Sequence, residues 1–310
     1  MDSQNRVKKS RVKDKIKKQA MFQSMALPGV IFMIVFTILP IYGILIAFQD
    51  FNIFRGVWDS TWIGLYNFNA FFNSPHFTLI MRNTIGMNVI RILVGFPLTI
   101  MVAIMINELT NLRFKKLLQT VSYLPFFISW VVLGGMIISW LSEFGLVNNV
   151  LYDLGLISER NLFLTNQSYY WTIAILSDIW RNLGWNTILY LAAMTGIDPT
   201  LYEAAKIDGG SKLQQIRYIT IPGIRNIIAL TLVLTISCLL GSNLDQTLIL
   251  QNTTNWNASE VLGSHIFSQG LGHANFSYAT AIGIFVSVIS FILVIGSNAI
   301  SKKIGDADIF

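Results

Sequence analysis

Residues 198–225 read DPTLYEAAKIDGGSKLQQIRYITIPGIR and connect two long apolar stretches of the chain. Asp198 is a preferred N-cap residue and Pro199 suits the first helical position, so the segment predicts a short helix that begins there. The glycine pair at 209–210 permits the positive φ angles that end a helix, and Ser211 can cap a second helix. We therefore expect two short helices joined by a break, between two apolar segments.

The composition on either side of this segment is that of a membrane protein. Only 12% of the 310 residues are charged and 53% are hydrophobic, whereas a soluble domain carries about 25% charged residues. Lipid must therefore cover much of the surface. A window of about 19 residues finds stretches long enough to cross roughly 30 Å of hydrocarbon, near residues 22–48, 83–107, 118–141, 169–197, 226–250 and 278–301. The sequence predicts an all-α membrane protein with six transmembrane helices.

The positions of Lys and Arg predict the orientation. Basic residues gather in the first 20 residues, in the connections 108–117 and 198–225, and in the tail, while the alternate connections hold only three. Short loops rich in Lys and Arg stay in the cytoplasm. We expect a multi-pass protein of the cell membrane with both termini cytoplasmic. The net charge of +6 then reflects topology and contact with anionic headgroups rather than nucleic-acid binding.

Several kinds of chemistry are excluded by what the sequence lacks. The single cysteine, Cys238, excludes an intramolecular disulfide. The three histidines, His76, His265 and His273, are scattered through connecting segments without metal-site spacing. No G-x-x-x-x-G-K-[ST] motif is present. We expect no catalytic residue, no metal and no cofactor in this chain, and any ATP hydrolysis must occur on another polypeptide.

The segment 198–225 closely resembles the EAA loop of ABC importer permeases, which is written Glu-Ala-Ala, three residues, Gly, nine residues, Ile, one residue, Leu-Pro. Ile221 replaces the usual Leu, and Arg225 stands where many relatives have a further Pro. The matching positions, with Asp208 on the same helix, are Glu203, Ala204, Ala205, Asp208, Gly209, Ile219 and Pro222.

In that family the first helix of this loop is the coupling helix, which docks on an ATPase subunit. The residue types suit the role that the resemblance implies. The small side chains of Ala204 and Ala205 permit close approach to another backbone, and Glu203 offers a carboxylate to an Arg or Lys of the partner.

The resemblance extends from about residue 83 to residue 302. The stretch SDIWRNLGWNTILYLAAMTGIDPTLYEAA, residues 177–205, is similar to carbohydrate permeases of the maltose-transporter type, and most to their polysaccharide and complex-oligosaccharide subgroup. NLDQTLILQN, residues 243–252, resembles the Phe-Asp-Gln segment of those permeases, with Leu244 in place of the frequent Phe. The resemblance implies a type I importer fold, a second non-identical permease, two ATPase subunits that bind ATP and Mg²⁺, and an extracellular solute-binding protein that delivers an oligosaccharide.

The expected organisation follows from the spans and the motif. It comprises a basic cytoplasmic segment, a first transmembrane helix, a core permease domain of five helices that includes the loop 198–225, and a cytoplasmic tail, over residues 1–20, 21–50, 83–302 and 303–310.

Ionisable groups inside spans are costly and mark functional sites by default. Arg91 lies in the second span, Asp178 and Arg181 in the fourth, and Asp245 in the fifth. Asp178 can pair with Arg181 locally, or Arg91 can pair across the bundle with Asp178 or Asp245. Structural pairing and direct lining of a substrate path both remain open.

Amide and indole side chains near these charges complete the set of candidate path residues. Gly241 and Ser242 should loosen the fifth helix just before Asn243, and broken helices at membrane depth are tolerated mainly where they line a cavity. The candidate path residues are Asn88, Arg91, Asp178, Arg181, Trp185, Asn186, Asn243, Asp245 and Gln246.

The sequence thus predicts the permease subunit of an ATP-driven oligosaccharide importer, and leaves other functions open. Within importers, the alternatives are phosphate, polyamine or metal as the solute. A stand-alone secondary transporter would need its own coupling ions and usually internal repeats. A membrane-embedded enzyme would need inward-facing His, Cys or paired carboxylates, and we expect none in the spans.

Overall fold

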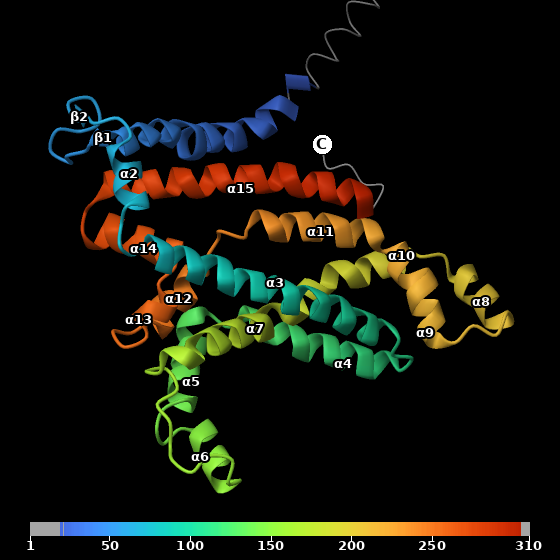
Figure 1. Ribbon diagram of the computed structural model, residues 1–310. Coiled ribbons are helices and arrows are strands. Elements are labelled where there is room, and N and C mark those ends of the chain that lie inside the picture. Colours follow the sequence, from blue (N-terminus) through green and yellow to red (C-terminus); the bar gives the residue numbers. More distant parts are fainter. Residues whose placement is uncertain (1–18, 21, 305–310) are drawn as a thin grey trace, which may run out of the picture.

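The computed structural model describes residues 19, 20 and 22–304, and side chains as far as residue 298. Long helices run side by side and form the body of the molecule (Figure 1). The expected basic segment, except for residues 19 and 20, and the tail beyond residue 304 lie outside the described residues.

The first helical span, Phe22–Phe48, is apolar along its whole length. Its hydrogen-bond pattern changes to a π turn at η1 (Ile34–Ile38) and to 3-10 type at η2 (Leu39–Phe48), where Pro40 stands near the start. Proline has no backbone N–H to give to the preceding turn, which explains the local change of pattern. A short ribbon follows, in which β1 (Gln49–Asp50) pairs antiparallel with β2 (Thr61–Trp62).

The remaining chain is helical. In order, its elements are α2 (Tyr66–Phe72), α3 (Phe77–Asn107), α4 (Leu112–Tyr123), η3 (Leu124–Phe127), α5 (Trp130–Trp140), α6 (Leu146–Asp153), α7 (Gln167–Thr195), α8 (Pro199–Ile207), α9 (Lys212–Gln215), η4 (Ile216–Thr220), α10 (Ile221–Gly223), α11 (Arg225–Ser237), α12 (Leu244–Leu250), α13 (Trp256–Ser259), α14 (Leu262–Phe267), η5 (Ser268–Gly272) and α15 (Phe276–Ile304).

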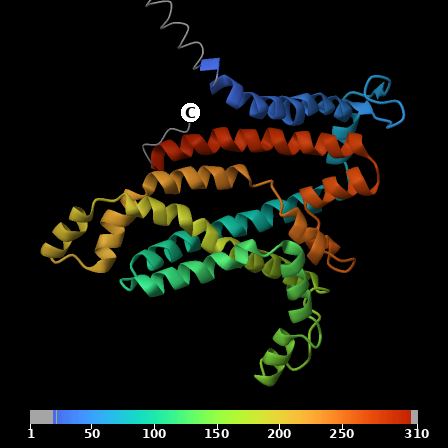
Figure 2. The ribbon, with the colours of Figure 1, turned by 180° about the vertical axis from the view of Figure 1, so that it is seen from behind.

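The bundle has two ends. The α8 end holds α8 to α10, the α3–α4 turn and the C-terminal end of α15 (Figure 1). The α13 end holds the β1–β2 ribbon, α2, α13 and α14. The arm formed by α5 and α6 leaves the bundle near the α13 end in both views (Figures 1 and 2).

Among the described residues, three helices are long and apolar enough to cross a membrane, and five if each of two bent helix pairs is one span. The three are Phe22–Phe48, Phe77–Asn107 and Phe276–Asn298. The long helix α7 is not among them, since it carries two charged residues and a row of amide side chains.

Two expected spans are not continuous helices. The stretch 118–141 bends by 95° between η3 and α5, because Pro125 lies in the 3-10 turn and Ser129 caps a new helix by accepting a hydrogen bond from the Val132 N–H. The stretch 226–250 is interrupted between Ser237 and Leu244, where α11 ends and α12 begins.

Close backbone contact fixes α4 against α7. A Cβ added at Gly184 would overlap the backbone carbonyl of Ser122, so only glycine permits this crossing. Small residues allow this approach between membrane helices. The crossing holds α7 in the middle of the bundle, where it also packs along α3.

Candidate functional site

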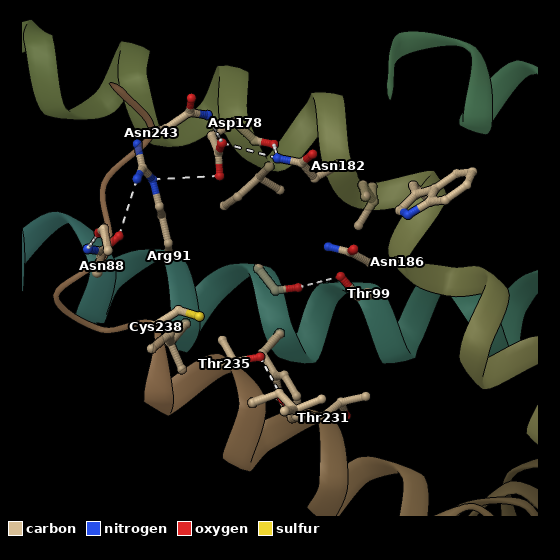
Figure 3. Close-up of a pocket in the computed structure, with 18 of the residues that line it drawn as sticks. Asn88, Arg91, Thr99, Asp178, Asn182, Asn186, Thr231, Thr235, Cys238 and Asn243 are labelled. Atoms are coloured by element: carbon tan, nitrogen blue, oxygen red, sulfur yellow. Dashed lines mark hydrogen bonds and ion pairs between the residues drawn. The ribbon is translucent and has the colours of Figure 1, made fainter. Parts of the chain in front are cut away.

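A cavity of about 710 Å³ lies between α3, α7, α11 and the interruption that follows α11 (Figure 3). Phe96, Trp185 and several aliphatic side chains form its apolar part. Its polar and charged lining residues are Asn88, Arg91, Thr99, Asp178, Asn182, Asn186, Tyr190, Thr231, Thr235, Ser242 and Asn243.

One wall of the cavity is a polar stripe along α7. Asp178, Asn182, Asn186 and Tyr190 are four residues apart and all line the cavity. Residues at this spacing share a face of a helix, with about 6 Å of rise between them. The stripe therefore offers hydrogen-bonding groups at regular steps along the bundle axis.

The charged pair in this cavity joins α3 to α7. Arg91 Nε lies 3.7 Å from Asp178 Oδ2, and the two side chains are 15% and 18% exposed. The Arg91 guanidinium also donates to Asn88 Oδ1 at 3.2 Å and to Gln246 Oε1 at 2.8 Å. Of the pairings that the sequence left open, the structure contains the one between Arg91 and Asp178.

Arg181, one of the candidate path residues, does not line the cavity. Its Nε donates to the carbonyl of Ile128 at 3.1 Å, and its guanidinium lies over the rings of Phe126 and Trp130 at 5.3 and 5.2 Å. The bend between η3 and α5 leaves the Ile128 carbonyl without a helical partner, and Arg181 satisfies it. This arginine therefore fastens the bend to α7 and does not pair with Asp178.

The interruption after α11 is held by side chains from other helices. Asn88 Nδ2 donates to the carbonyls of Leu239 and Gly241 at 2.8 and 2.6 Å. Asn243 caps α12 and its Nδ2 donates to Asp178 Oδ1 at 3.0 Å. The expectation of a loosened helix at this point is confirmed, and the carbonyls that it frees at Leu239 and Gly241 are bound by Asn88 beside the cavity.

Two further candidate residues lie outside the cavity lining. Gln246 is 1% exposed and donates to the Ala174 carbonyl at 2.7 Å and to Ser177 Oγ at 2.9 Å, so it joins α12 to α7. Asp245, in the first turn of α12, is exposed and does not line the cavity. The sequence grouped both residues with Asn243, but of the three only Asn243 lines the cavity.

Trp185 lines the cavity as expected, with its indole stacked on Phe126 at a centroid distance of 4.3 Å and an interplanar angle of 4°. Asn186 also lines it (Figure 3), and its side chain forms no hydrogen bond with the described residues. Its amide thus keeps both its donors and its acceptor for a ligand or water.

The expected set omits several polar lining residues. Thr99, Thr231 and Thr235 line the cavity and each donate a hydrogen bond to a carbonyl one turn back on their own helix, and the Thr231 hydroxyl also lies 2.7 Å from the Tyr190 hydroxyl. The four-residue spacing from Asp178 to Tyr190 was present in the sequence and indicates a polar helix face. The sequence does not show which faces of α3 and α11 oppose it.

The loop 198–225 projects from the α8 end of the bundle (Figure 1). As expected, Asp198 caps α8 by accepting from the Thr200 N–H at 2.9 Å, and Ser211 caps α9. Gln214 completes a capping box with Ser211. Gly209 adopts a φ of +75°. Gly210 was expected to share this role but does not; its N–H instead donates to the Ala205 carbonyl at 2.7 Å.

The expected second helix of this loop runs without a break from Lys212 to Gly223, with the π turn η4 between α9 and α10. A bend of 63° then separates α10 from α11, next to Pro222. Ile219 is half-buried at this junction. The loop therefore meets α11 at an angle and does not continue it.

Side-chain contacts hold the loop as one unit. Tyr202 Oη lies 3.0 Å from Thr220 Oγ1 and joins α8 to η4. Gln215 Nε2 donates to the Gly210 carbonyl at 3.1 Å, and Lys212 Nζ lies 2.6 Å from Glu108 Oε2 after α3. The loop is thus connected both to itself and to the α3–α4 turn.

The outward surface of α8 is exposed and mixed in character. Glu203, Ala204 and Asp208 are exposed, Ala205 is half-buried, and Ile207 is 86% exposed. Ile207 is thus an exposed aliphatic side chain near carboxylates, on a short helix with no covering element among the described residues.

Comparisons with known proteins were consistent with one another. A family model described as "Binding-protein-dependent transport system inner membrane component" matches residues 95–306. The chain is 38% identical over 304 residues to the "Polygalacturonan/rhamnogalacturonan transport system permease protein YteP" of Bacillus subtilis (strain 168), covering 98% of this chain and 94% of that protein. It is 31% identical to "Protein LplB" of the same organism, covering 95% and 92%.

Two solved structures are similar along nearly the whole chain. One is the "Crystal structure of a bacterial ABC transporter involved in the import of the acidic polysaccharide alginate", with a TM-score of 0.87, 35% identity, and coverage of 95% of this chain and 99% of that one. The other, the "Crystal structure of bacterial alginate ABC transporter in complex with alginate pentasaccharide-bound periplasmic protein", has a TM-score of 0.87, 34% identity, and coverage of 96% and 100%.

Proposed function

We propose how this chain carries out import; it belongs to the family of binding-protein-dependent transport system inner membrane components. It is the membrane permease of a carbohydrate ABC importer, has the ABC importer permease fold, and is not the ATPase subunit. Its substrate is an oligosaccharide or polysaccharide that a binding protein delivers. The proposal concerns how the cavity and the loop 198–225 carry out this import.

The cavity is our candidate for this chain's share of the substrate path, and the polar stripe on α7 is the observation that carries the proposal. Sugar hydroxyls both donate and accept hydrogen bonds, as do the Asn, Thr and Tyr side chains that line the cavity. Polar groups at membrane depth are retained where they face a water-filled route. The proposed path residues are Asn88, Arg91, Asp178, Trp185, Asn186 and Asn243 from the expected set, with Asn182 and the lining threonines added.

Arg181, Asp245 and Gln246 have different proposed roles. Arg181 and Gln246 hold the neighbouring helices in position through backbone carbonyls, and Asp245 lies outside the cavity. None of the three is proposed to contact the substrate.

The loop 198–225 is our candidate for the contact with an ATPase subunit. The resemblance to the EAA loop and the exposure of Glu203, Ala204 and Asp208 support this role. When the ATPase pair closes, a force on α8 reaches η4 through Tyr202 and reaches the end of α3 through Lys212. Since α3 forms one wall of the cavity, movement of the loop alters the cavity.

The proposed topology has six spans, with α7 as the fourth, and both termini in the cytoplasm. The concentration of basic residues in connections at the α8 end supports it. The proposed assembly contains a second, non-identical permease, two ATPase subunits that hold ATP and Mg²⁺, and an extracellular solute-binding protein. The division into segments 1–20, 21–50, 83–302 and 303–310 stays a proposal, with α3 beginning earlier, at Phe77.

The single cysteine provides a direct test, because Cys238 lines the cavity. In the assembled importer, a small hydrophilic thiol reagent should modify Cys238, and oligosaccharide trapped in the cavity should slow the reaction. A matched control carries Cys238→Ser together with Leu176→Cys, which places the thiol on an exposed apolar position of α7 outside the cavity. The control should not react. A Cys238 that reacts no faster than the control would rule out a water-filled path at this position.

A further inference from the structure

The β1–β2 ribbon and the loop that it closes carry large apolar side chains that face outward. Phe54 is 97% exposed, Trp58 is 84% exposed, and Ile53 and Trp62 are 61% and 59% exposed. Arg55 is exposed among them. We call residues 53–58 together with Trp62 the aromatic loop.

The polar side chains of this segment are used to hold its backbone. Asn52 Oδ1 accepts from the Phe54 N–H at 2.9 Å, and Ser60 Oγ donates to the Gly56 carbonyl and accepts from the Asn52 N–H at 3.2 Å. Gly56 has a φ of +72°, which completes the turn. A loop surrounded by water usually has the opposite arrangement, with polar side chains outward and apolar ones covered.

The aromatic loop is also fixed to the helices beside it. The Phe51 N–H donates to Ser277 Oγ at 3.0 Å, and Asn67 Nδ2 donates to the Ala47 carbonyl at 2.9 Å. The Trp62 indole stacks on the ring of Phe48, the last residue of the first span, at 5.5 Å and 11°. The loop is therefore held at a set height relative to the end of that span.

The surface of the aromatic loop continues the apolar surface of the span Phe22–Phe48. The most apolar window of that span is only 6% buried within the chain, and the chain belongs to a family of membrane permeases, so lipid or a neighbouring subunit covers it. The ribbon follows the span directly and lies at the margin of the α13 end in both views (Figures 1 and 2). It is remote from the cavity, which lies between α3, α7 and α11.

We propose that the aromatic loop is an interfacial anchor that inserts into the lipid headgroup region at the α13 end. Trp and Phe side chains favour this region, where an indole keeps its N–H near water and its ring in apolar surroundings. The Arg55 guanidinium can reach lipid phosphates at the same depth. Because the loop is fixed to Phe48 and to α15, the anchor sets the depth and tilt of the first span relative to the bundle.

The test measures the depth of a nitroxide label. A Cys238→Ser background leaves no other cysteine, and Asp59→Cys places the label beside Trp58 at an exposed position. Thr253→Cys is the matched control, exposed in the connection after α12. The complete importer is reconstituted in vesicles of phosphatidylethanolamine and phosphatidylglycerol, and collisions of the label with oxygen and with a water-soluble nickel chelate are compared.

We expect the ratio of oxygen to nickel collisions to be several-fold higher at position 59 than at position 253. A second variant, Phe54→Ser with Trp58→Ser, should lower the ratio at position 59 to that of the control. Equal ratios at the two positions without added binding protein would overturn the anchor. Immobilisation of the label only on addition of sugar-loaded binding protein would overturn it too, in favour of a protein-docking surface.

Discussion

The ion pair between Arg91 and Asp178 can be tested by double-mutant cycles, because a second arginine, Arg181, lies one turn from Asp178 but does not contact it. At the 3.7 Å between Arg91 Nε and Asp178 Oδ2, Coulomb attraction is at most about 4.5 kcal/mol for an effective dielectric constant near 20. Asp178 also accepts hydrogen bonds from Asn182 and Asn243 at 3.1 and 3.0 Å, and these remain when the arginine is removed.

We therefore expect a coupling energy of about 1–3 kcal/mol between Arg91→Met and Asp178→Asn, which lies below this ceiling because both side chains are partly exposed. The same cycle with Arg181→Gln should give less than about 0.5 kcal/mol. The measurement is the equilibrium unfolding of the purified permease in mixed detergent micelles, followed by tryptophan fluorescence.

The relative size of the two coupling energies tests whether Asp178 pairs with Arg91 and not with Arg181. If Asp178 couples to Arg181 as strongly as to Arg91, the cavity is not organised as described. Arg91 and Asp178 would then not be the pair that joins α3 to α7, whatever the absolute coupling energies.

Three further variants test other contacts. Gly184→Leu should destabilise the permease by about 1–3 kcal/mol, since no side chain fits at the α4–α7 crossing. Thermal denaturation measures this effect. Gly135→Leu is the control, because an added Cβ there meets nothing within 4 Å. Asn88→Leu should cost about 1–3 kcal/mol for each carbonyl of the interruption that it leaves without a partner, and a normal unfolding midpoint would contradict this. Glu260 lies outside the candidate spans, and although burial raises its pKa, hydrogen bonds from the adjacent histidine, glutamine and serine hold that pKa below its ordinary value of 4.5. The ionised Glu260 carboxylate therefore stabilises the fold above the pKa of the unfolded state, and this contribution is lost as the pH falls through the pKa of the folded state. With Glu260→Gln, thermal stability should fall less steeply on acidification below about pH 4.5. An unchanged acid profile would refute this.

Local signals in the sequence predicted local structure well. The caps at Asp198 and Ser211, the positive φ at Gly209 and the interruption near Gly241 depend on a few neighbouring residues, and these were predicted correctly. The role of Gly210 was not predicted, because it depends on a hydrogen bond from its N–H to the carbonyl of Ala205 in the preceding helix.

Contacts between helices were harder to predict. Arg181 and Asp178 are at a spacing that allows pairing, but the bend after η3 supplies a backbone carbonyl that Arg181 binds instead. That bend lies inside an apolar stretch whose hydropathy gives no sign of a 95° change in direction. Likewise, the amide of Gln246 could bind a sugar hydroxyl, but it is buried and donates its hydrogen bond to the Ala174 carbonyl instead.

The proposed contact between the exposed helix α8 and an ATPase subunit is tested most directly by the effect of Glu203→Lys on assembly and uptake. The permease is expressed with its partner subunits, and the ATPase subunits that copurify with it are quantified beside oligosaccharide uptake. Lys116→Glu, an exposed charge reversal on α4 at the same end of the bundle, is the control. We expect the Glu203→Lys permease to remain inserted but to lose both the ATPase subunits and uptake, while the control keeps them. Normal uptake by Glu203→Lys would contradict the proposed contact.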